Sequence, residues 1–496
     1  MYRAPRWLLL LALCLVTSAA VFVAQAADTI KPPLMPVLLT SFLPATQGCP
    51  MAHCDAQMTD WENAPPPDAG AQLIWYDPRQ SPPGQLMGSG RGLGCAGNGQ
   101  IVACTLGRVP ADYPDVLCDP QVQDTLVVYA YSDADKLPAF LWSSGDLLNC
   151  SAFTSAPLVG AGGSIITADD STIIRFGPNG TPVWQTPTAG GSPISPVLLA
   201  DGVVVLVTVD GPITAYDTET GALLAELTLT EGDSFYETVN TPAVSGNRLY
   251  ISTHLDADSA YGRLYALDFI PEQSAFQIAW YFDFGGPSGA SPLLVGNTLY
   301  FDGDRLDPQA DFAPHIYAVQ DTGTAGQLLW IMPAAGQIQA SFALDPRGGF
   351  WTFTIGTPVK DHRWLTRMRL TDQNGDGLGD VLERIDLDAL LTLPGVHVPS
   401  SVMSMAGTPA APVMIVGATA FDEVGGVDST YIVAIDLNTR ARLWRVWLPS
   451  EPTAGQFAIA LGQYGPRAFF TNKETGVWVI GQPTQYKLLM PSFFRQ

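Results

Sequence analysis

A short motif recurs through the middle of the chain and constrains the fold more than any other feature. One or two small residues, a proline and a run of apolar residues occur at Ala156-Pro157-Leu158-Val159, Ser195-Pro196-Val197-Leu198, Thr241-Pro242-Ala243-Val244, Ser291-Pro292-Leu293-Leu294 and, more loosely, Thr408-Pro409-Ala410. The first four prolines are 39, 46 and 50 residues apart. Periods of this length are typical of propeller blades or solenoid units, which bury their apolar faces against their neighbours.

A second pattern closes most repeats and predicts a hairpin whose last strand ends in tryptophan. It reads YALDFIPEQSAFQIAW at 265–280, YAVQDTGTAGQLLW at 317–330 and VAIDLNTRARLW at 433–444, with degenerate copies ending at Trp142 and Trp184. The copy TAYDTETGALLA at 214–225 ends in alanine instead. Its Asp-Thr-Glu-Thr-Gly tip is a turn, because Asp and Thr bond their own backbone and Gly accepts a positive φ. We expect the tryptophans to pack between repeats.

The form A-x-D-x-x-T-G-x-x-x-W, together with strands such as Gly246-Asn247-Arg248-Leu249-Tyr250, resembles PQQ-like β-propeller repeats. That family includes quinoprotein alcohol dehydrogenases and the propeller lipoprotein of the outer-membrane barrel-assembly machine. The resemblance implies an all-β propeller of four-stranded blades. The number of closing patterns gives about eight blades, with seven as the alternative. The last repeat lacks its outermost strand, and we expect Leu73-Ile74-Trp75-Tyr76 to supply it and to close the ring.

The composition and the termini predict four segments. Residues 1–26 are a signal peptide, since Arg3 and Arg6 precede an apolar run that ends at Ala24-Gln25-Ala26; a retained membrane anchor is the alternative. A Cys/Pro-rich arm over 27–70, the propeller over 71–481 and a tail over 482–496 follow. We expect a secreted, periplasmic or cell-surface protein with no membrane span after signal removal.

Charge and cysteines narrow the class further. Without Arg3 and Arg6 the chain carries 22 basic against 47 acidic residues, a net charge of −25, which disfavours nucleic-acid binding. An even number of cysteines in an exported chain points to disulfides, here with fifteen possible pairings of six candidates. The motif Cys49-Pro50-Met51-Ala52-His53-Cys54 is interpreted as a disulfide loop rather than a copper or haem site. The six candidates are Cys49, Cys54, Cys95, Cys104, Cys118 and Cys150.

The stretch LTDQNGDGLGDVLERI at 370–385 matches the oxygen-donor spacing of an EF-hand loop. The residues before and after it alternate with period two, which predicts strands instead of helices. We therefore expect an enlarged blade hairpin that binds a structural calcium ion. Glu383 would be a ligand only in the EF-hand geometry, and a hairpin without metal is the alternative. The loop resembles the D-x-N-x-D-G-x-x-D loops of integrin-type propellers. This resemblance implies as ligands the side chains of Asp372, Asn374, Asp376 and Asp380 and the carbonyl of Leu378.

Three functions remain open from the sequence. The first is a non-catalytic exported scaffold that binds a protein partner, since no catalytic motif is present. The second is a dehydrogenase that holds the tricarboxylate cofactor PQQ and calcium in its central channel, with Arg175, Arg263 and Lys360 as the cations available to line it. The third is a structural subunit of a cell-surface complex, with the arm over 27–70 as its docking element. The scarcity of cations favours the first.

Overall fold

The computed structural model divides the chain into two compact units, Met1–Ser41 and Phe42–Gln496. The described residues all belong to the second unit. They are 42–43, 45–77, 94–107, 124–131, 138–238, 240–287, 289–304, 314–338, 342–355, 359–421, 427–448, 456–461, 465–472 and 476–483. The predicted signal peptide and the predicted tail, apart from 482–483, lie outside them.

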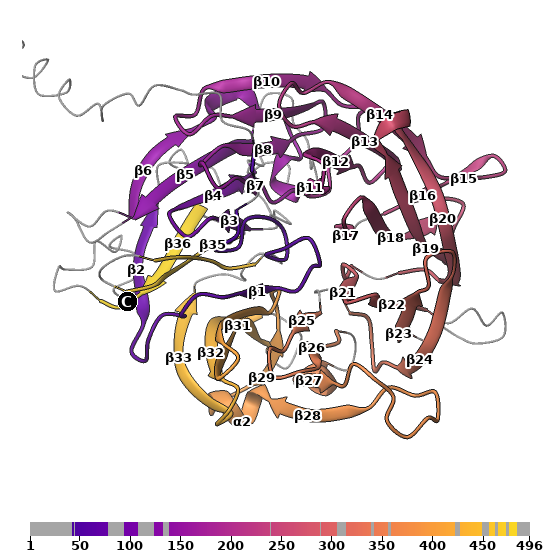
Figure 1. Ribbon diagram of the computed structural model, residues 1–496. Helices are drawn as coiled ribbons and strands as arrows, with labels where there is room; N and C mark the ends of the chain where they lie inside the picture. Colours follow the sequence, from indigo (N-terminus) through magenta and orange to yellow (C-terminus); the bar gives the residue numbers. More distant parts are fainter. Residues whose placement is uncertain are drawn as a thin grey trace, which may run out of the picture. The chain divides into compact units, whose positions relative to one another are not determined.

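The second unit is an eight-bladed β-propeller, which confirms the predicted fold class and decides between eight and seven blades. Each blade is built on four antiparallel strands, and two of the eight sheets have six strands, one of which includes β1 (Trp61–Glu62) parallel to an inner strand. Four of the eight inner strands follow the small-Pro-apolar motif, whereas the looser copy Thr408-Pro409-Ala410 begins at the end of an inner strand and forms the turn after it. In Figure 1 the sheets surround a common axis, with β7, β11, β17, β21 and β25 nearest to the middle. Side chains on both faces of the sheets are buried, and they fill the space between adjacent blades.

The first four blades run in order from the inner to the outer strand. Blade one holds β3 (Cys95–Gly97), β4 (Ile101–Leu106), β5 (Thr125–Tyr131) and β6 (Pro138–Ser143). Blade two holds β7 (Leu158–Val159), β8 (Ile165–Ala168), β9 (Thr172–Phe176) and β10 (Pro182–Pro187). Blade three holds β11 (Val197–Leu198), β12 (Val203–Val207), β13 (Pro212–Asp217) and β14 (Leu223–Thr228). Blade four holds β17 (Ala243–Ser245), β18 (Arg248–Leu255), β19 (Asp258–Ile270) and β20 (Ala275–Gly285), joined by β15 (Thr230–Glu231) and β16 (Ser234–Glu237).

The remaining blades repeat the pattern. Blade five holds β21 (Leu293–Val295), β22 (Thr298–Asp304), β23 (Pro314–Asp321) and β24 (Gly326–Pro333). Blade six holds β25 (Ala343–Leu344), β26 (Phe350–Thr352), β27 (Trp364–Met368) and β28 (Val381–Asp386). Blade seven holds β30 (Ser404–Thr408), β31 (Ala411–Phe421), β32 (Val427–Asp436) and β33 (Ala441–Leu448), with β29 (Val396–Pro399) beside β31. Blade eight holds β34 (Ala458–Ala460), β35 (Arg467–Asn472), β36 (Gly476–Gly481) and β2 (Gln72–Asp77).

Short helical turns connect some of these strands. Four are 3-10 turns: η1 (Gly145–Leu147), η2 (Ala152–Thr154), η3 (Pro271–Gln273) and η4 (Val359–His362). The single described α-helix, α2 (Leu387–Leu391), follows β28 and is capped by Asp386, whose side chain accepts the N–H groups of Asp388 and Ala389. In the described part of the chain, no helix is long and apolar enough to cross a bilayer.

The ring closes as the sequence predicted. β2 pairs antiparallel with β36, with Leu73 opposite Ile480 and Trp75 opposite Val479. Blade eight therefore combines one strand from the amino-terminal part of the chain with three from its end. This arrangement removes a sheet edge that would otherwise remain unpaired.

The tryptophans that end the repeats connect neighbouring blades. The indole of Trp280 at the end of blade four lies over Gly326 of blade five and donates a hydrogen bond of 2.9 Å to Asp321. Trp330 of blade five lies in the same way over Gly379 of blade six. The tryptophans at 142, 184 and 444 likewise donate to a backbone carbonyl at the next blade. The prediction that they serve blade packing is confirmed.

Candidate functional site

Residues 49–62, here called the axial segment, lie across the middle of the propeller, where Figure 1 shows them as part of the indigo trace that includes β1 (Trp61–Glu62). Their oxygens accept hydrogen bonds from N–H groups of seven of the eight inner strands. In chain order the pairs are Cys49 O with Gly97, Pro50 O with Val159, Ala56 O with Val244, Gln57 O with Leu294, Thr59 O with Leu344, Asp60 O with Met405 and Glu62 Oε2 with Ile459, at 2.6 to 3.0 Å. The axial segment therefore satisfies the inner edges of the blades, one after another.

Unusual backbone conformations allow the axial segment to turn around the axis. Four of its residues that are not glycine, His53, Cys54, Met58 and Asp60, have φ between 52° and 70°. Each such conformation costs on the order of 1 kcal/mol or more, so the surrounding contacts must hold it. The Cys49–Cys54 disulfide closes the first loop, and the carboxylate of Asp55 accepts the N–H groups of Gln57 and Thr59. The sequence assigned these residues to an arm, and the structure places them in the propeller.

Three carboxyl groups are buried or partly buried along the axial segment. Asp60 is fully buried, and the Nδ1 atom of His53 lies 3.1 Å from its carboxyl oxygens. Burial raises the pKa of Asp60, while the nearby His53 opposes the rise. Burial also raises the pKa of Asp55, against its hydrogen bonds from Thr59. These side chains form an acidic stretch in the centre of the ring.

Glu62 is the most perturbed of the carboxyl groups. Its Oε2 atom accepts the N–H of Ile459, while Oε1 is buried with no hydrogen-bond partner in the described part of the chain. Burial raises the pKa of Glu62 well above its ordinary value. A neutral Glu62 is therefore the form that this environment favours.

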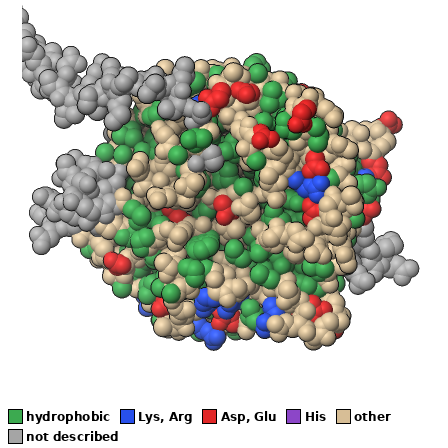
Figure 2. All heavy atoms as spheres, in the orientation of Figure 1, with side chains coloured by type: hydrophobic (Ala, Val, Ile, Leu, Met, Phe, Trp, Pro, Cys, Tyr) green, Lys and Arg blue, Asp and Glu red, His purple; other side chains and the backbone are tan. Residues whose placement is uncertain are grey.

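A pocket of about 910 Å³ opens beside the axial segment. Residues 42–64 form one wall, and Leu158 of β7, Leu198 of β11 and Val244 of β17 contribute to the other. Among the described residues that line it, the charged ones are Asp55 and Glu62, and none is Lys, Arg or His. In Figure 2 hydrophobic side chains gather around the hollow in the middle of this face, and Lys and Arg lie away from it.

The cations that the sequence offered for a PQQ site lie elsewhere. Arg175 of β9 is buried and bonds the carbonyl of Thr218 at 2.8 Å and Glu219 at 3.1 Å. Arg263 of β19 pairs with Asp283 at 2.6 Å and with Glu231 at 2.7 Å. Lys360 belongs to η4, and its side chain is outside the described ones. Two carboxyl groups and no described cation line the pocket, whereas a cofactor with three carboxylates favours cationic groups around it.

The acidic loop lies between β27 and β28, as predicted, and forms the hairpin of blade six. Gly379 packs under Trp330, and the loop backbone exchanges hydrogen bonds with Ile331 of blade five. Asp372 accepts the N–H groups of Asn374, Gly375 and Gly377, and the bond from Gly377 contributes most to lowering the pKa of Asp372.

The other expected calcium ligands also bond within the loop. Asn374 Nδ2 lies 2.9 Å from Asp376, the carboxylate of Asp376 accepts the N–H of Leu378, and Asp380 accepts that of Gln373. In the described part of the chain, no three His, Cys, Asp or Glu side chains lie close enough together to hold a metal ion. Calcium binding by this loop stays a prediction.

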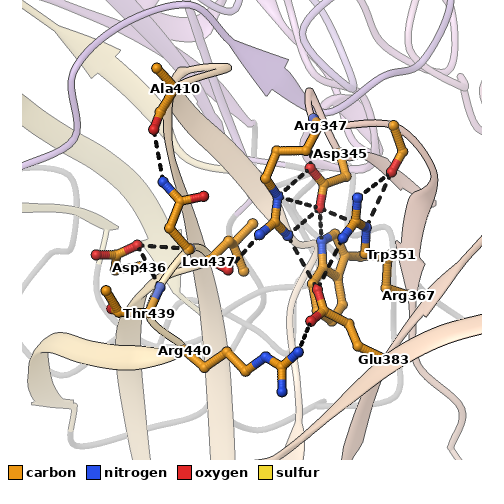
Figure 3. A network of polar contacts seen from close by, with 12 residues as sticks. Asp345, Arg347, Trp351, Arg367, Glu383, Ala410, Asp436, Leu437, Thr439 and Arg440 are labelled. Atoms are coloured by element: carbon orange, nitrogen blue, oxygen red, sulfur yellow. Dashed lines mark hydrogen bonds and ion pairs between the residues drawn. The ribbon is translucent and has the colours of Figure 1, made fainter.

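Glu383 points away from the loop into a network of charged groups, which Figure 3 shows. Its carboxylate pairs with Arg347 at 3.2 Å, Arg367 at 3.3 Å and Arg440 at 2.7 Å. Both Arg347 and Arg367 also pair with Asp345, and although burial opposes it, their bonds and charges lower the pKa of Asp345. These contacts connect blade six to blade seven, so Glu383 has a packing role and the EF-hand geometry is not formed.

The cysteines are oxidised wherever the structure describes them. Cys49 pairs with Cys54 and Cys95 pairs with Cys104. Cys150 is also disulfide-bonded, and Cys118 lies outside the described residues. Cys95 and Cys104 are partners across β3 and β4, so this disulfide fixes the inner hairpin of blade one.

Comparisons with known proteins agree with the repeats. A family model described as "Outer membrane protein assembly factor BamB" matches residues 119–322. The chain resembles the PQQ-like propellers. A comparison with curated protein sequences finds no match.

Two solved structures share this PQQ-like propeller fold. A europium-containing methanol dehydrogenase aligns with a TM-score of 0.54 at 12% identity, over 86% of this chain and 89% of that one. A quinohemoprotein alcohol dehydrogenase from Comamonas testosteroni aligns with a TM-score of 0.54 at 12% identity, over 92% and 84%. BamB from Moraxella catarrhalis aligns at 0.43 and 13% identity, over 73% and 90%. At these identities the two dehydrogenase structures show the fold alone and leave the activity open.

Proposed function

We propose that this protein is an exported, non-catalytic propeller that binds a protein partner as an assembly scaffold. The observation that carries the proposal is the occupied centre of the ring. The axial segment bonds seven inner strands, and the pocket that remains beside it has acidic groups and no described cation. The resemblance implies that a PQQ-dependent dehydrogenase would hold its cofactor here with calcium and basic residues, and no basic residue is among the described ones of the pocket lining.

Two further findings support the proposal. The family model that matches residues 119–322 describes an outer-membrane protein assembly factor, whose role is to act on other proteins. Five of the six cysteines after residue 26 are disulfide-bonded, which is typical of oxidising compartments outside the cytoplasm. A structural part in a larger cell-surface complex is a form of the same scaffold function.

We also propose that the hairpin of blade six binds a structural calcium ion. Support comes from the spacing of Asp372, Asn374, Asp376 and Asp380, whose oxygens are the donors that calcium prefers. The loop is anchored on blade five through Gly379, so an ion there would stiffen a contact between blades.

A tryptophan-fluorescence titration with PQQ, with and without Ca²⁺, tests the scaffold against the dehydrogenase. We expect no saturable quenching up to about 100 µM PQQ in protein whose circular dichroism shows a folded β-protein. Saturable, calcium-dependent quenching at micromolar PQQ would overturn the scaffold proposal. Crosslinking in the cells that produce the protein should also yield a defined partner in a fixed ratio.

A further inference from the structure

The inner strands present one amide to the axis at the same position of the repeat. Val159, Val244 and Leu294 each lie two residues after the proline of the small-Pro-apolar motif, and each donates its N–H to a carbonyl of the axial segment. The hydrogen-bond ladder between β7 and β8 explains why this N–H points toward the axis. In β7 the next residue, Gly160, bonds Ser164 within the hairpin, so the N–H of Val159 points away from its own sheet.

Leu198 of β11 occupies this position in blade three. The next residue, Leu199, bonds Val203 at 2.9 Å, as Gly160 bonds Ser164 at 2.8 Å in blade two. The N–H of Leu198 therefore also points toward the axis. None of the described residues accepts a hydrogen bond from it. Blade three is thus the one blade of the eight whose inner strand has no described hydrogen bond to the axial segment.

The path of the axial segment explains the gap. Between the carbonyls of Pro50 and Ala56 the chain turns inward through the Cys49–Cys54 loop. There Gln456 of blade eight donates to the carbonyl of Met51 at 2.6 Å and accepts from the N–H of His53. The loop is thus held against blade eight, and the pocket lies between it and β11.

We propose that this pocket binds an extended apolar peptide of a partner protein, with a peptide carbonyl accepting the N–H of Leu198. Six of the seven equivalent amides bond a backbone carbonyl of an extended segment, so the eighth position has the geometry for the same acceptor. This inference rests on the scaffold function and names the class of ligand for it.

The lining of the pocket sets the chemistry of the peptide. Leu43 and Leu461, which line the pocket and are exposed, offer apolar contacts to its side chains. Asp55 and Glu62 are the charged residues of the lining. Asp55 accepts hydrogen bonds from its own segment, and no described cation lines the pocket. The site therefore accepts a neutral peptide or a free amino terminus and disfavours an acidic peptide.

Saturation-transfer NMR of the folded chain with tetrapeptides tests the proposal. The probes are acetyl-Ala-Val-Leu-Ala-amide, the same sequence with a free amine, and acetyl-Ala-Val-Glu-Ala-amide. We expect the first two to bind with Kd values on the order of 0.1 to 1 mM and the acidic probe at least tenfold more weakly. Ala200→Trp fills the pocket rim and should abolish the signal.

Ala410→Trp is the matched control, because Ala410 is an exposed residue of the inner hairpin of blade seven and does not line the pocket. It should bind the probes as the unaltered chain does. Equal binding by Ala200→Trp, or no binding of any probe, would refute the peptide site. So would a concentration-dependent dimer, seen by light scattering and lost in Ala200→Trp, because a second copy would then occupy the pocket.

The outcomes also separate this inference from the proposed function. If neither the peptides nor PQQ bind, the peptide site is wrong and the scaffold function stands. If PQQ binds the unaltered chain and does not bind Ala200→Trp, both the peptide site and the scaffold function are wrong.

Discussion

A pair of proline substitutions tests whether one inner amide lacks a partner. Leu198 and Leu294 follow the same Ser-Pro-apolar sequence, are both buried, and belong to β11 and β21. Proline removes the N–H at either position and fixes φ in the same way, so these costs and most of the lost leucine burial cancel in the comparison. Only Leu294→Pro removes a described hydrogen bond, the 2.9 Å contact to the carbonyl of Gln57.

The expected difference follows from that single bond. Losing it and leaving the Gln57 carbonyl without its donor costs about 1 to 3 kcal/mol. With a urea dependence of about 3 kcal/mol per M, Leu294→Pro should unfold about 0.3 to 1 M earlier than Leu198→Pro. Leu198→Ala and Leu294→Ala, which keep the amide, measure the side-chain share. Equal destabilisation by the two prolines, after this correction, would refute the assignment of a free amide at Leu198.

Three further predictions concern blade contacts, calcium and pH. Gly326→Ala should destabilise by about 1 to 3 kcal/mol in urea unfolding, since its Cβ would lie 2.7 Å from the ring of Trp280; unchanged stability would contradict the packing. Calcium at 100 times its Kd should stabilise the chain by about 2.7 kcal/mol in a thermal shift. Asp372→Ala should lose this stabilisation and Glu383→Gln should keep it; the reverse pattern would indicate that the loop binds calcium in the EF-hand geometry. Because the pKa of Glu62 is raised in the fold, its contribution to stability should fall as pH rises above about 4.5, and Glu62→Gln should flatten that slope; an unchanged slope would show that Glu62 is not the titrating group.

The repeats made the fold readable from the sequence. The prolines at 157, 196, 242 and 292 and the closing tryptophans report local structure that recurs, so the blade pattern and even the closing strand at Leu73–Tyr76 followed from them. The acidic loop was placed correctly for the same reason, because its flanking strands alternate with period two.

The axial segment was missed because its signal is not periodic. Its contacts join residues far apart in the sequence, such as His53 and Gln456. Its turns depend on residues other than glycine with positive φ, which the sequence does not mark. One indication of it was present: Met51, Ala52 and Met58 are apolar residues in the stretch interpreted as a Cys/Pro-rich arm, and all three are buried. The pocket, and the lack of an acceptor for the N–H of Leu198 among the described residues, could not be inferred without knowing which blades this segment reaches.

The position of the axial segment has a consequence for the order of synthesis. His53 and Gln456 are 403 residues apart, so at about 5 to 20 residues per second the partner of the first is made roughly 20 to 80 s later. During that time β2 and the oxygens of residues 49–62 have no complete ring to bond. The amino-terminal part of the propeller is thus made before the blades that it bonds and is the last to complete its contacts. A chain of this design depends on protection from aggregation until its final blade has been made.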